Sequence, residues 1–523
     1  MNYADLFRVT LPETALEVAA LLVLVVDLGL LRKAALKTRV AVAAMLGVAG
    51  CGAALWALYA AGTGGFSGSD GLLLAAGGTA GVAQTGILIL TALTLLLLVD
   101  SDFTRNAGEY VAVVLMAAAG GLIIAAAQEL LVIFVGLELL SLGLYILTAF
   151  AKRSGKSAEA ALKYYLFGGM SAAFLLFGFS YLYGLTGTTS IWQIKDAITI
   201  SGPSALLYVA WVLIVAGLGF KIAAVPFHLW APDTYEGAPA PAAAFIASVS
   251  KVASFALLLT LSLNWFTPGP WVGGQREFVE KVLGQYYQTW PKLATILLIA
   301  AAASMILGNL AALAQISVRR LLAYSAIAHA GYMLLGIATM PRYTGGVDLF
   351  HFYLSTIGPF RQSANAVLYY ILTYGLTTIG AFGVVGVVER ATGSDRLDAF
   401  LGLHKRNPVL AAVLMVLFLS LAGIPPLVGF WAKFNLFAAV LGMSGGPVPF
   451  ALVSLAVGMS AVSLYYYLQV LKRAYVMPAA DETPIHAHPV TMGVLVAIAA
   501  AVVVMGCFPA LLQGWIAGFY PVG

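Results

Sequence analysis

Apolar residues along this chain gather in runs of about twenty, the length an α-helix needs to cross the hydrocarbon core of a membrane. The runs fall at 12–31, 40–62, 81–99, 109–127, 129–150, 158–184, 203–229, 240–265, 292–316, 320–340, 364–389, 409–441, 448–471 and 489–516. Short polar connections separate them. The pattern predicts an all-α integral membrane protein with about fourteen transmembrane helices.

Composition agrees with a membrane location. Hydrophobic residues make up 61% of the 523 residues and charged residues only 9%, whereas a soluble domain carries about 25% charged residues. The 55 glycines suit close contact between helices in lipid. No hydrophilic stretch is long enough for a separate soluble domain.

The net charge of +5 does not indicate nucleic-acid binding, because the basic residues lie in the short connections. Sixteen lie in odd-numbered connections, and seven lie in even-numbered connections and the N-terminal segment. Cytoplasmic connections carry an excess of lysine and arginine. The bias predicts that the odd connections are cytoplasmic and that both termini lie on the non-cytoplasmic side.

Two apolar runs contain similar interruptions. Ala223-Ala224-Val225-Pro226-Phe227 lies in the seventh run and Ala422-Gly423-Ile424-Pro425-Pro426 in the twelfth. Proline inside a helix removes a backbone hydrogen bond and breaks it, and paired broken helices mark the pathway in secondary transporters. The runs are five apart, so a five-helix repeat would be inverted in the membrane.

Several ionisable residues lie deep within apolar runs: Lys221, Lys251, Lys433 and Glu138. A charge at the bilayer centre costs about 2.5–3.5 kcal/mol, and such residues usually mark ion or proton pathways. A low dielectric disfavours the charged form of a lysine and of a glutamate, so both types of side chain can titrate near neutral pH. A nearby glutamate holds a lysine charged, and their separation lets the lysine release its proton. These residues predict a proton relay.

Three further residues have competing interpretations. Lys163 lies about one turn into its apolar run. Its side chain can therefore reach the membrane surface, and a place in the relay is the alternative. Glu129 starts the fifth run, where an anion is stabilised by the helix N-terminus, and a functional role is the alternative. His329 lies in the middle of a run, where its titration near neutral pH favours a relay role over a structural one.

The remaining histidines and cysteines favour neither a metal nor a cofactor site in this chain. His228 is expected to order the break beside Trp230. His486 and His488 are two residues apart and make a weak metal signal without further ligands. Cys51 and Cys507 cannot supply the four ligands of an iron–sulfur cluster.

Three motifs carry a family resemblance. They are the string from Phe220-Lys221 through Pro226-Phe227-His228-Leu229-Trp230-Ala231-Pro232-Asp233-Thr234-Tyr235-Glu236-Gly237-Ala238-Pro239-Ala240-Pro241, the string Ser248–Ala253, and Gly429–Phe434. They resemble the N-subunit family of proton-pumping NADH:quinone oxidoreductase (respiratory complex I), which is homologous to subunits of multi-subunit sodium/proton antiporters. Lys433 distinguishes the chain from M subunits, which carry glutamate there, and the chain lacks the lateral helix of L subunits.

The resemblance implies two inverted five-helix antiporter-like repeats, each with a proline-broken helix. The expected divisions are 1–106 for three flanking helices, 107–265 for the first repeat, 291–475 for the second and 488–523 for the last helix. Connections 266–291 and 341–363 are longer than is usual in the family.

The resemblance also assigns roles to the relay residues. Glu138 and Lys221 form an ion pair, which Lys163 modulates. Lys251 is the central relay, and His329 passes the proton to Lys433 at the exit.

The function implied is that of a proton-translocating membrane subunit of an NADH:quinone oxidoreductase in a bacterial inner membrane. FMN, iron–sulfur clusters and quinone are then expected in partner subunits, since the chain has no glycine-rich dinucleotide fingerprint and no cysteine cluster. One alternative is a subunit of a multi-subunit cation/proton antiporter. The other, a membrane scaffold, leaves four intramembrane lysines unexplained.

Overall fold

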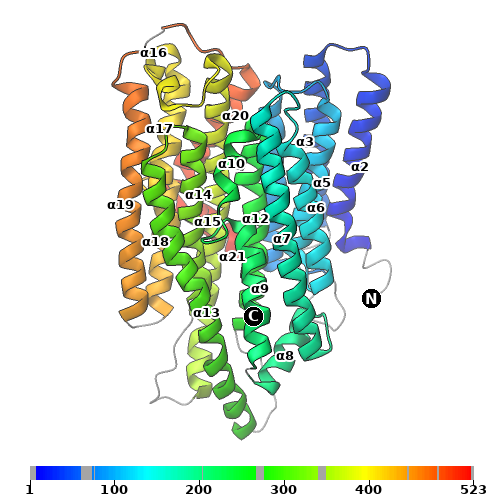
Figure 1. Ribbon diagram of the computed structural model, residues 1–523, viewed down its shortest axis with the longest axis vertical. Helices are drawn as coiled ribbons and strands as arrows, with labels where there is room; N and C mark the ends of the chain where they lie inside the picture. Colours follow the sequence, from blue (N-terminus) through cyan, green and yellow to red (C-terminus); the bar gives the residue numbers. More distant parts are fainter. Residues whose placement is uncertain are drawn as a thin grey trace.

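The computed structural model describes residues 7–60, 74–75, 77–202, 204–266, 276–339, 349–443, 447–479 and 482–519. Within these ranges the regular structure is helical, and extended residues form isolated bridges only. The helices stand side by side in one bundle (Figure 1). The all-α prediction is confirmed.

The first half of the chain contains α2 (Leu11–Val25), a π-helical turn at Val26–Leu30, α3 (Leu36–Ala60), α4 (Gly78–Leu98), α5 (Ala107–Ala126), α6 (Leu130–Thr148), α7 (Gly155–Thr186), α8 (Ile191–Ser201), α9 (Ala205–Ile222), α10 (Trp230–Gly237), α11 (Ala240–Ala247) and α12 (Val249–Phe266). The second half contains α13 (Arg276–Leu313), α14 (Val318–Ala338), α15 (Leu349–Thr392), a 3₁₀ turn at Leu397–Phe400, α16 (Leu403–Arg406), α17 (Pro408–Ala422), α18 (Val428–Met443), α19 (Pro447–Tyr475), α20 (Pro489–Cys507) and α21 (Pro509–Gly518).

Twelve helical segments of the described chain are long and apolar enough to cross a membrane. Two further crossings are built from shorter pieces. The 15 residues of α2 continue through the π-helical turn, and α17 and α18 together make one broken crossing. These pieces account for the fourteen crossings predicted from the apolar runs.

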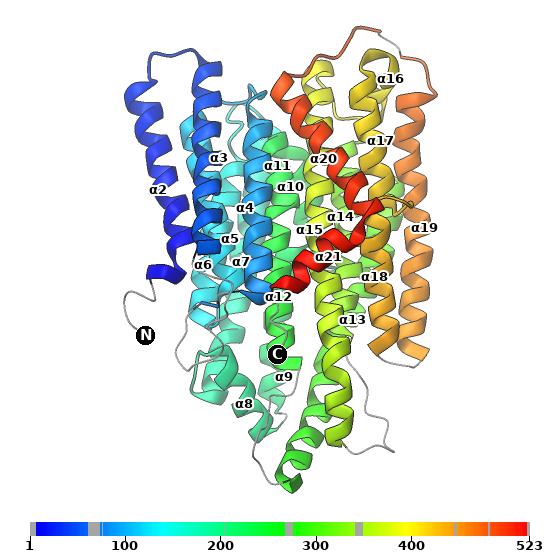
Figure 2. The ribbon, with the colours of Figure 1, turned by 180° about the vertical axis from the view of Figure 1, so that it is seen from behind.

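Odd and even connections lie at opposite ends of the bundle. The odd connection that contains α16 lies at the end opposite α8, which belongs to an even connection (Figure 1). The start of α2 lies at the α8 end (Figure 2). The last described residue, Phe519, accepts a hydrogen bond of 3.2 Å from the backbone N–H of Gly78, the first residue of α4, which follows an even connection. Both ends of the described chain therefore lie beside even connections.

The two predicted breaks are present and begin alike. The helix α9 ends at Ile222 and α17 ends at Ala422. The next residues, Ala223 and Gly423, adopt the left-handed conformation with φ of 58° and 90°, which commonly ends a helix. In both breaks, a backbone N–H just beyond the helix end donates a hydrogen bond to a carbonyl of the helix. Ala224 N–H donates to the Gly219 carbonyl at 2.8 Å, and Ile424 N–H donates to the Leu419 carbonyl at 3.0 Å.

Two more interruptions were not predicted. Ser248 separates α11 from α12, and its hydroxyl donates to the Ala244 carbonyl at 2.6 Å. Such back-bonding bends helices, so Lys251 lies three residues after a bend and not in a continuous helix. The last run is also divided, because Pro509 starts a new helix, α21, after Cys507.

The two long connections are partly helical. The helix α13 begins at Arg276 and α15 at Leu349, before the apolar runs 292–316 and 364–389. Both helices therefore extend beyond the span that was predicted for them, into 266–291 and 341–363.

Candidate functional site

Four of the predicted relay residues lie inside the bundle. Lys221, Lys251, His329 and Lys433 are between 2% and 6% exposed. None of their side chains therefore reaches the lipid or water surface, and each depends on protein groups for its hydrogen bonds. A buried polar group costs free energy unless it is hydrogen-bonded.

Lys221 lies in the last turn of α9 and contacts α6. Its Nζ donates a hydrogen bond to Oγ of Ser141, and the Ser141 hydroxyl donates to the Leu137 carbonyl of its own helix. The resemblance implied an ion pair with Glu138. The structure gives Lys221 the hydroxyl one turn further along α6 instead, while the Glu138 charge is near enough to act on it electrostatically.

Lys251 lies on α12 and uses the break in α9. Its Nζ donates to the Ile222 carbonyl at 3.2 Å and to the Ala326 carbonyl of α14 at 2.9 Å. The Ile222 carbonyl is one of the last in α9, where the helix leaves carbonyls without intrahelical partners. The negative end of the helix dipole also favours a cation there. One ammonium group therefore joins the first half of the chain to α14 in the second.

Lys433 lies on α18 and uses the second break in the same way. Its Nζ donates to the carbonyls of Leu421 and Ala422 at 3.0 and 2.9 Å, and to Oγ of Ser460 at 2.8 Å. The two carbonyls belong to the end of α17. Each broken helix therefore supplies carbonyls to a buried lysine from a different helix.

His329 lies on α14 between these two lysines. Both Lys251 and Lys433 are near enough to act electrostatically on its imidazole ring. Its Nδ1 is 2.9 Å from the Tyr370 hydroxyl of α15, and its Nε2 is 3.5 Å from the Tyr467 hydroxyl of α19. Both ring nitrogens are thus oriented by phenol groups.

Lys163 has a different environment from the other lysines. Its side chain is 41% exposed and pairs with Glu159 at 2.7 Å and with Asp233 at 2.8 Å. Asp233 belongs to α10, far along the chain from α7. Lys163 therefore lies in a charged surface cluster and not among the buried lysines.

That cluster was not identified from the sequence. Arg320 pairs with Asp233 at 2.7 Å and with Glu236 at 3.0 Å, and Lys156 pairs with Glu236 at 3.1 Å. Burial alone would raise the pKa of both carboxyl groups, but hydrogen bonds from Lys163 and Arg320 hold the pKa of Asp233 below its ordinary value. Hydrogen bonds from Arg320 and Lys156 do the same for the pKa of Glu236. The cluster ties α7 and α10 to α14.

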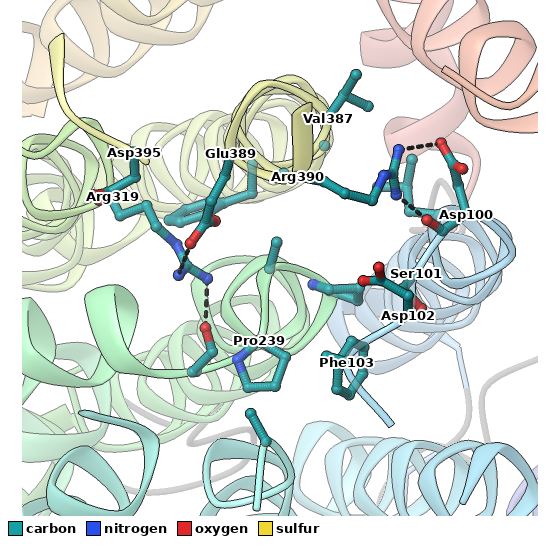
Figure 3. A pocket seen from close by; sticks show the side chains of 18 of the residues that line it. Asp100, Ser101, Asp102, Phe103, Pro239, Arg319, Val387, Glu389, Arg390 and Asp395 are labelled. Carbon is teal, nitrogen blue, oxygen red and sulfur yellow. Dashed lines mark hydrogen bonds and ion pairs between the residues drawn. The ribbon is translucent and has the colours of Figure 1, made fainter. Parts of the chain in front are cut away.

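Beside the cluster, a cavity of about 430 Å³ opens among the odd connections. Figure 3 shows Arg319 and Glu389 on one side of it and Arg390 and Asp100 on the other, each joined as an ion pair. Arg319 also donates to the Glu236 carbonyl at 2.8 Å. The adjacent arginines Arg319 and Arg320 were the part of the sequence that could have indicated this charged region. They were counted only among the basic residues that orient the chain in the membrane.

The secondary candidates have local roles. Glu129 accepts a hydrogen bond of 2.6 Å from the Thr189 hydroxyl, which fixes the connection between α7 and α8. Nδ1 of His488 accepts from the Val490 N–H at 3.3 Å at the start of α20. His228 is buried and its Nδ1 has no partner in the described chain. Among the described residues, no three His, Cys, Asp or Glu gather as they would around a metal ion.

Comparison with known proteins places this arrangement in a family. The model described as "NADH:quinone oxidoreductase/Mrp antiporter, TM" matches residues 127–272 and 281–460. NADH-quinone oxidoreductase subunit N 2 of Acidobacterium capsulatum is 46% identical, over 99% of this chain and 99% of its own. The chain belongs to the NADH:quinone oxidoreductase/Mrp antiporter family.

Solved structures of the NADH:quinone oxidoreductase/Mrp antiporter family share the fold. A chain of respiratory complex I from Thermus thermophilus is 31% identical with a TM-score of 0.74, covering 96% of this chain and 98% of its own. A chain of the Mrp complex from Dietzia sp. is 21% identical with a TM-score of 0.75, covering 98% of both chains. The antiporter-like architecture inferred from the motifs is therefore confirmed, while the roles of the single residues stay predictions.

Proposed function

We propose that this chain is the proton-translocating membrane subunit of an NADH:quinone oxidoreductase complex. The observation that carries the proposal is the series Lys221, Lys251, His329 and Lys433, four buried titratable groups that continue from the first half of the chain into the second. A scaffold does not need intramembrane ionisable groups, because each of them is costly in lipid. A proton pathway does.

The contacts support an alternation between charged and neutral lysines. The ammonium form of Lys251 or Lys433 is stabilised by carbonyls at the end of a broken helix. A second positive charge nearby disfavours that form, so a proton that arrives at one site promotes release from the next. Glu138 stabilises a proton on Lys221 when the two side chains approach. Transfer then proceeds from Lys221 through Lys251 and His329 to Lys433.

The redox chemistry of the complex belongs to partner subunits. The relatives in Acidobacterium capsulatum and Roseiflexus castenholzii are named as N subunits of NADH-quinone oxidoreductase. We infer that NADH oxidation, with FMN and iron–sulfur clusters, and quinone reduction take place outside this chain. The location that fits these relatives is a bacterial inner membrane, with the odd connections cytoplasmic.

Membrane vesicles that contain the assembled complex provide the test. NADH addition should acidify the vesicle interior while quinone is reduced, and Lys433→Met should abolish acidification in complexes that still assemble on native gels. Purified complexes should carry flavin and iron–sulfur absorbance in the partner subunits. Colourless partners, together with proton movement driven by a sodium or potassium gradient, would instead identify a cation/proton antiporter.

A further inference from the structure

The C-terminal helix is interrupted and leaves a buried backbone carbonyl without a partner in its own helix. Figure 2 shows α20 and α21 running obliquely across the bundle. Proline has no N–H and cannot continue a helix, so α20 ends at Cys507 and α21 starts at Pro509. The Phe508 N–H makes the last bond of α20, to the Val504 carbonyl at 2.8 Å. The Gly506 carbonyl lies beyond that bond, where a helix carbonyl needs a donor from elsewhere.

An indole group of the second broken crossing supplies that donor. Nε1–H of Trp431, on α18, donates to the Gly506 carbonyl at 2.8 Å. An indole has one donor and no acceptor, and it usually finds a partner when its ring is buried. Trp431 lies two residues before Lys433 on the same helix. The hydrogen bond therefore connects the C-terminal helix to the helix that carries the last lysine of the relay.

The backbone of α20 also packs directly against the second break. Gly506 is buried, and a Cβ atom added there would overlap the Pro426 carbonyl oxygen and lie 2.7 Å from Cα of Leu427. Only glycine allows so close an approach, because it has no side chain, and small residues let helices in membranes pack closely. The indole hydrogen bond and the glycine packing thus fasten α20 to the same break.

This break is the one whose carbonyls bind Lys433. Nζ of Lys433, on α18, donates to the Leu421 and Ala422 carbonyls at the end of α17. A Cβ atom at the next residue, Gly423, would lie 3.0 Å from the Lys433 side chain. The side chain therefore lies across the break, with its stem on one half of the crossing and its acceptors on the other. A displacement of α18 relative to α17 changes its hydrogen bonds.

The two carbonyls are the main acceptors of this lysine. The other groups that face it are the Ser460 hydroxyl of α19 at 2.8 Å, the Tyr332 ring of α14 at 5.5 Å, and the His329 imidazole, which feels its charge. Within the described part of the chain no carboxylate pairs with Lys433. How tightly the amine holds a proton therefore depends on neutral acceptors at the end of α17.

The first break is closed in a different way. Trp230 follows it as Trp431 follows the second, but Nε1–H of Trp230 donates to the Phe220 carbonyl at 2.8 Å, in the last turn of α9. Its ring also stacks on Tyr164 of α7, with ring centroids 4.4 Å apart. The first break is thus closed by its own crossing and its neighbour. The indole at the second break instead bonds α20, which lies outside the repeat predicted at 291–475.

We propose that α20 positions Lys433 by holding the second break through Trp431 and Gly506. The hydrogen bond fixes α18 relative to α20, and the glycine packing fixes the break relative to the same helix. Together they keep α17 and α18 at the separation at which Nζ reaches its carbonyls. Trp431 and Gly506 are positioning residues, since they act through Lys433. The proposal rests on the proton-translocating function proposed above.

The chain offers a matched control for each contact. Trp431→Phe removes the indole N–H and keeps an aromatic ring, and Trp515→Phe makes the same change on α21, where the indole has no hydrogen bond within the described chain. Gly506→Ala adds a methyl group against the break. Gly493→Ala adds one to the same helix at a position with no atom within 4 Å. A general effect of altering the C-terminal helices would appear in the controls as well.

The experiment measures NADH-driven acidification against pH in vesicles that contain equal amounts of assembled complex. Trp431→Phe and Gly506→Ala should each lower the rate about threefold to tenfold, the factor expected for loss of one ordinary hydrogen bond. They should also move the pH dependence to lower pH, because an amine with weaker acceptors holds its proton less tightly. Trp515→Phe and Gly493→Ala should keep the wild-type pH dependence and stay within about twofold of the wild-type rate, less than about 0.5 kcal/mol in the barrier.

Three results would overturn the positioning role. They are a wild-type rate in assembled Trp431→Phe, a lower rate with an unchanged pH dependence, and an equal loss in the control variants. Trp431→Phe keeps the test decisive if Gly506→Ala does not assemble. Lys433→Met separates the two proposals: if it abolishes acidification while Trp431→Phe pumps as wild type, only the role of α20 is wrong. If Lys433→Met itself pumps normally, the proposed relay is wrong.

Discussion

Two of the buried lysines are bound by backbone carbonyls that a broken helix leaves free. Lys251 bonds the end of α9 and Lys433 the end of α17, whereas Lys221 bonds a serine hydroxyl. A carbonyl is a neutral acceptor, so it can hold an ammonium group without fixing a full countercharge beside it. Such a lysine can gain and lose a proton more readily than one in a permanent ion pair, because a nearby carboxylate stabilises the charged form.

Replacing Lys251 with methionine should stop proton transfer and leave the fold intact. Methionine keeps the length and apolar stem, and it removes a buried cation. The carbonyls of Ile222 and Ala326 lose one partner each, at about 1 kcal/mol apiece. Acidification by vesicles should fall at least tenfold at normal complex abundance, with quinone reduction falling if the two processes are tightly coupled.

The arginine variant is the matched control at this position. Lys251→Arg keeps the positive charge, but a guanidinium group hardly deprotonates in proteins. This variant should therefore pump no better than Lys251→Met. If Lys251→Met assembled and pumped at the wild-type proton-per-electron ratio, Lys251 would be a structural lysine.

Glu138→Gln should weaken pumping without disrupting assembly. Glu138 is half-buried and makes no ion pair within the described chain, so its neutralisation strands no buried partner. The variant removes the charge that stabilises a proton on Lys221. Vesicle acidification should drop several-fold while native gels show a normal complex. Normal pumping would remove Glu138 from the relay.

At the scale of elements, the helix breaks show what the sequence could predict. Pro226 and Pro425-Pro426 marked two breaks correctly, because proline cannot continue a helix. The bend at Ser248 had no such mark, since a serine that bonds its own helix looks like any other serine in an apolar run. The distant partner of Lys163 was also hidden: Asp233 lies 70 residues away, and only the packing of α10 against α7 brings it there.

The cluster around Arg320 should make the protein less stable as the pH falls into the acidic range. The pKa of Asp233 and of Glu236 is lower in the folded protein than in the unfolded chain. Each group therefore contributes stability above its unfolded pKa of about 4, and this contribution is lost as the pH falls through the folded pKa. The thermal midpoint of the purified complex should fall as the pH is lowered below about 5.

Arg320→Gln should flatten that pH dependence, because both carboxyl groups lose a cation. At neutral pH the cost should be modest, about 1 kcal/mol or less per pair, since the partners are partly exposed. Arg396→Gln provides a control in an odd connection, where the described chain gives the guanidinium no ion pair. Equal pH profiles for wild type and Arg320→Gln would contradict this role of the cluster.

For the whole molecule, fourteen crossings follow directly from the apolar runs, and the charge count agrees with the arrangement of connections at the two ends (Figure 1). The sequence could not show which side chains meet, because residues such as Lys251 and Ala326 come together only when the two halves pack. The motifs therefore located the relay residues, while their partners required the structure. The basic residues alone predict which end of the bundle faces the cytoplasm.

Cysteine labelling in intact cells should establish that orientation. The native thiols are first replaced, as Cys51→Ala and Cys507→Ala, and single cysteines are then placed at exposed positions on opposite ends, as Arg8→Cys and Glu482→Cys. Sixteen basic residues in the odd connections, against seven in the even connections and the N-terminal segment, predict that a membrane-impermeant reagent labels Arg8→Cys before permeabilisation and Glu482→Cys only afterwards. Both variants should be labelled after permeabilisation, which controls for reactivity. The opposite pattern would place the odd connections outside the cytoplasm and would reverse the direction of proton transfer proposed for the relay.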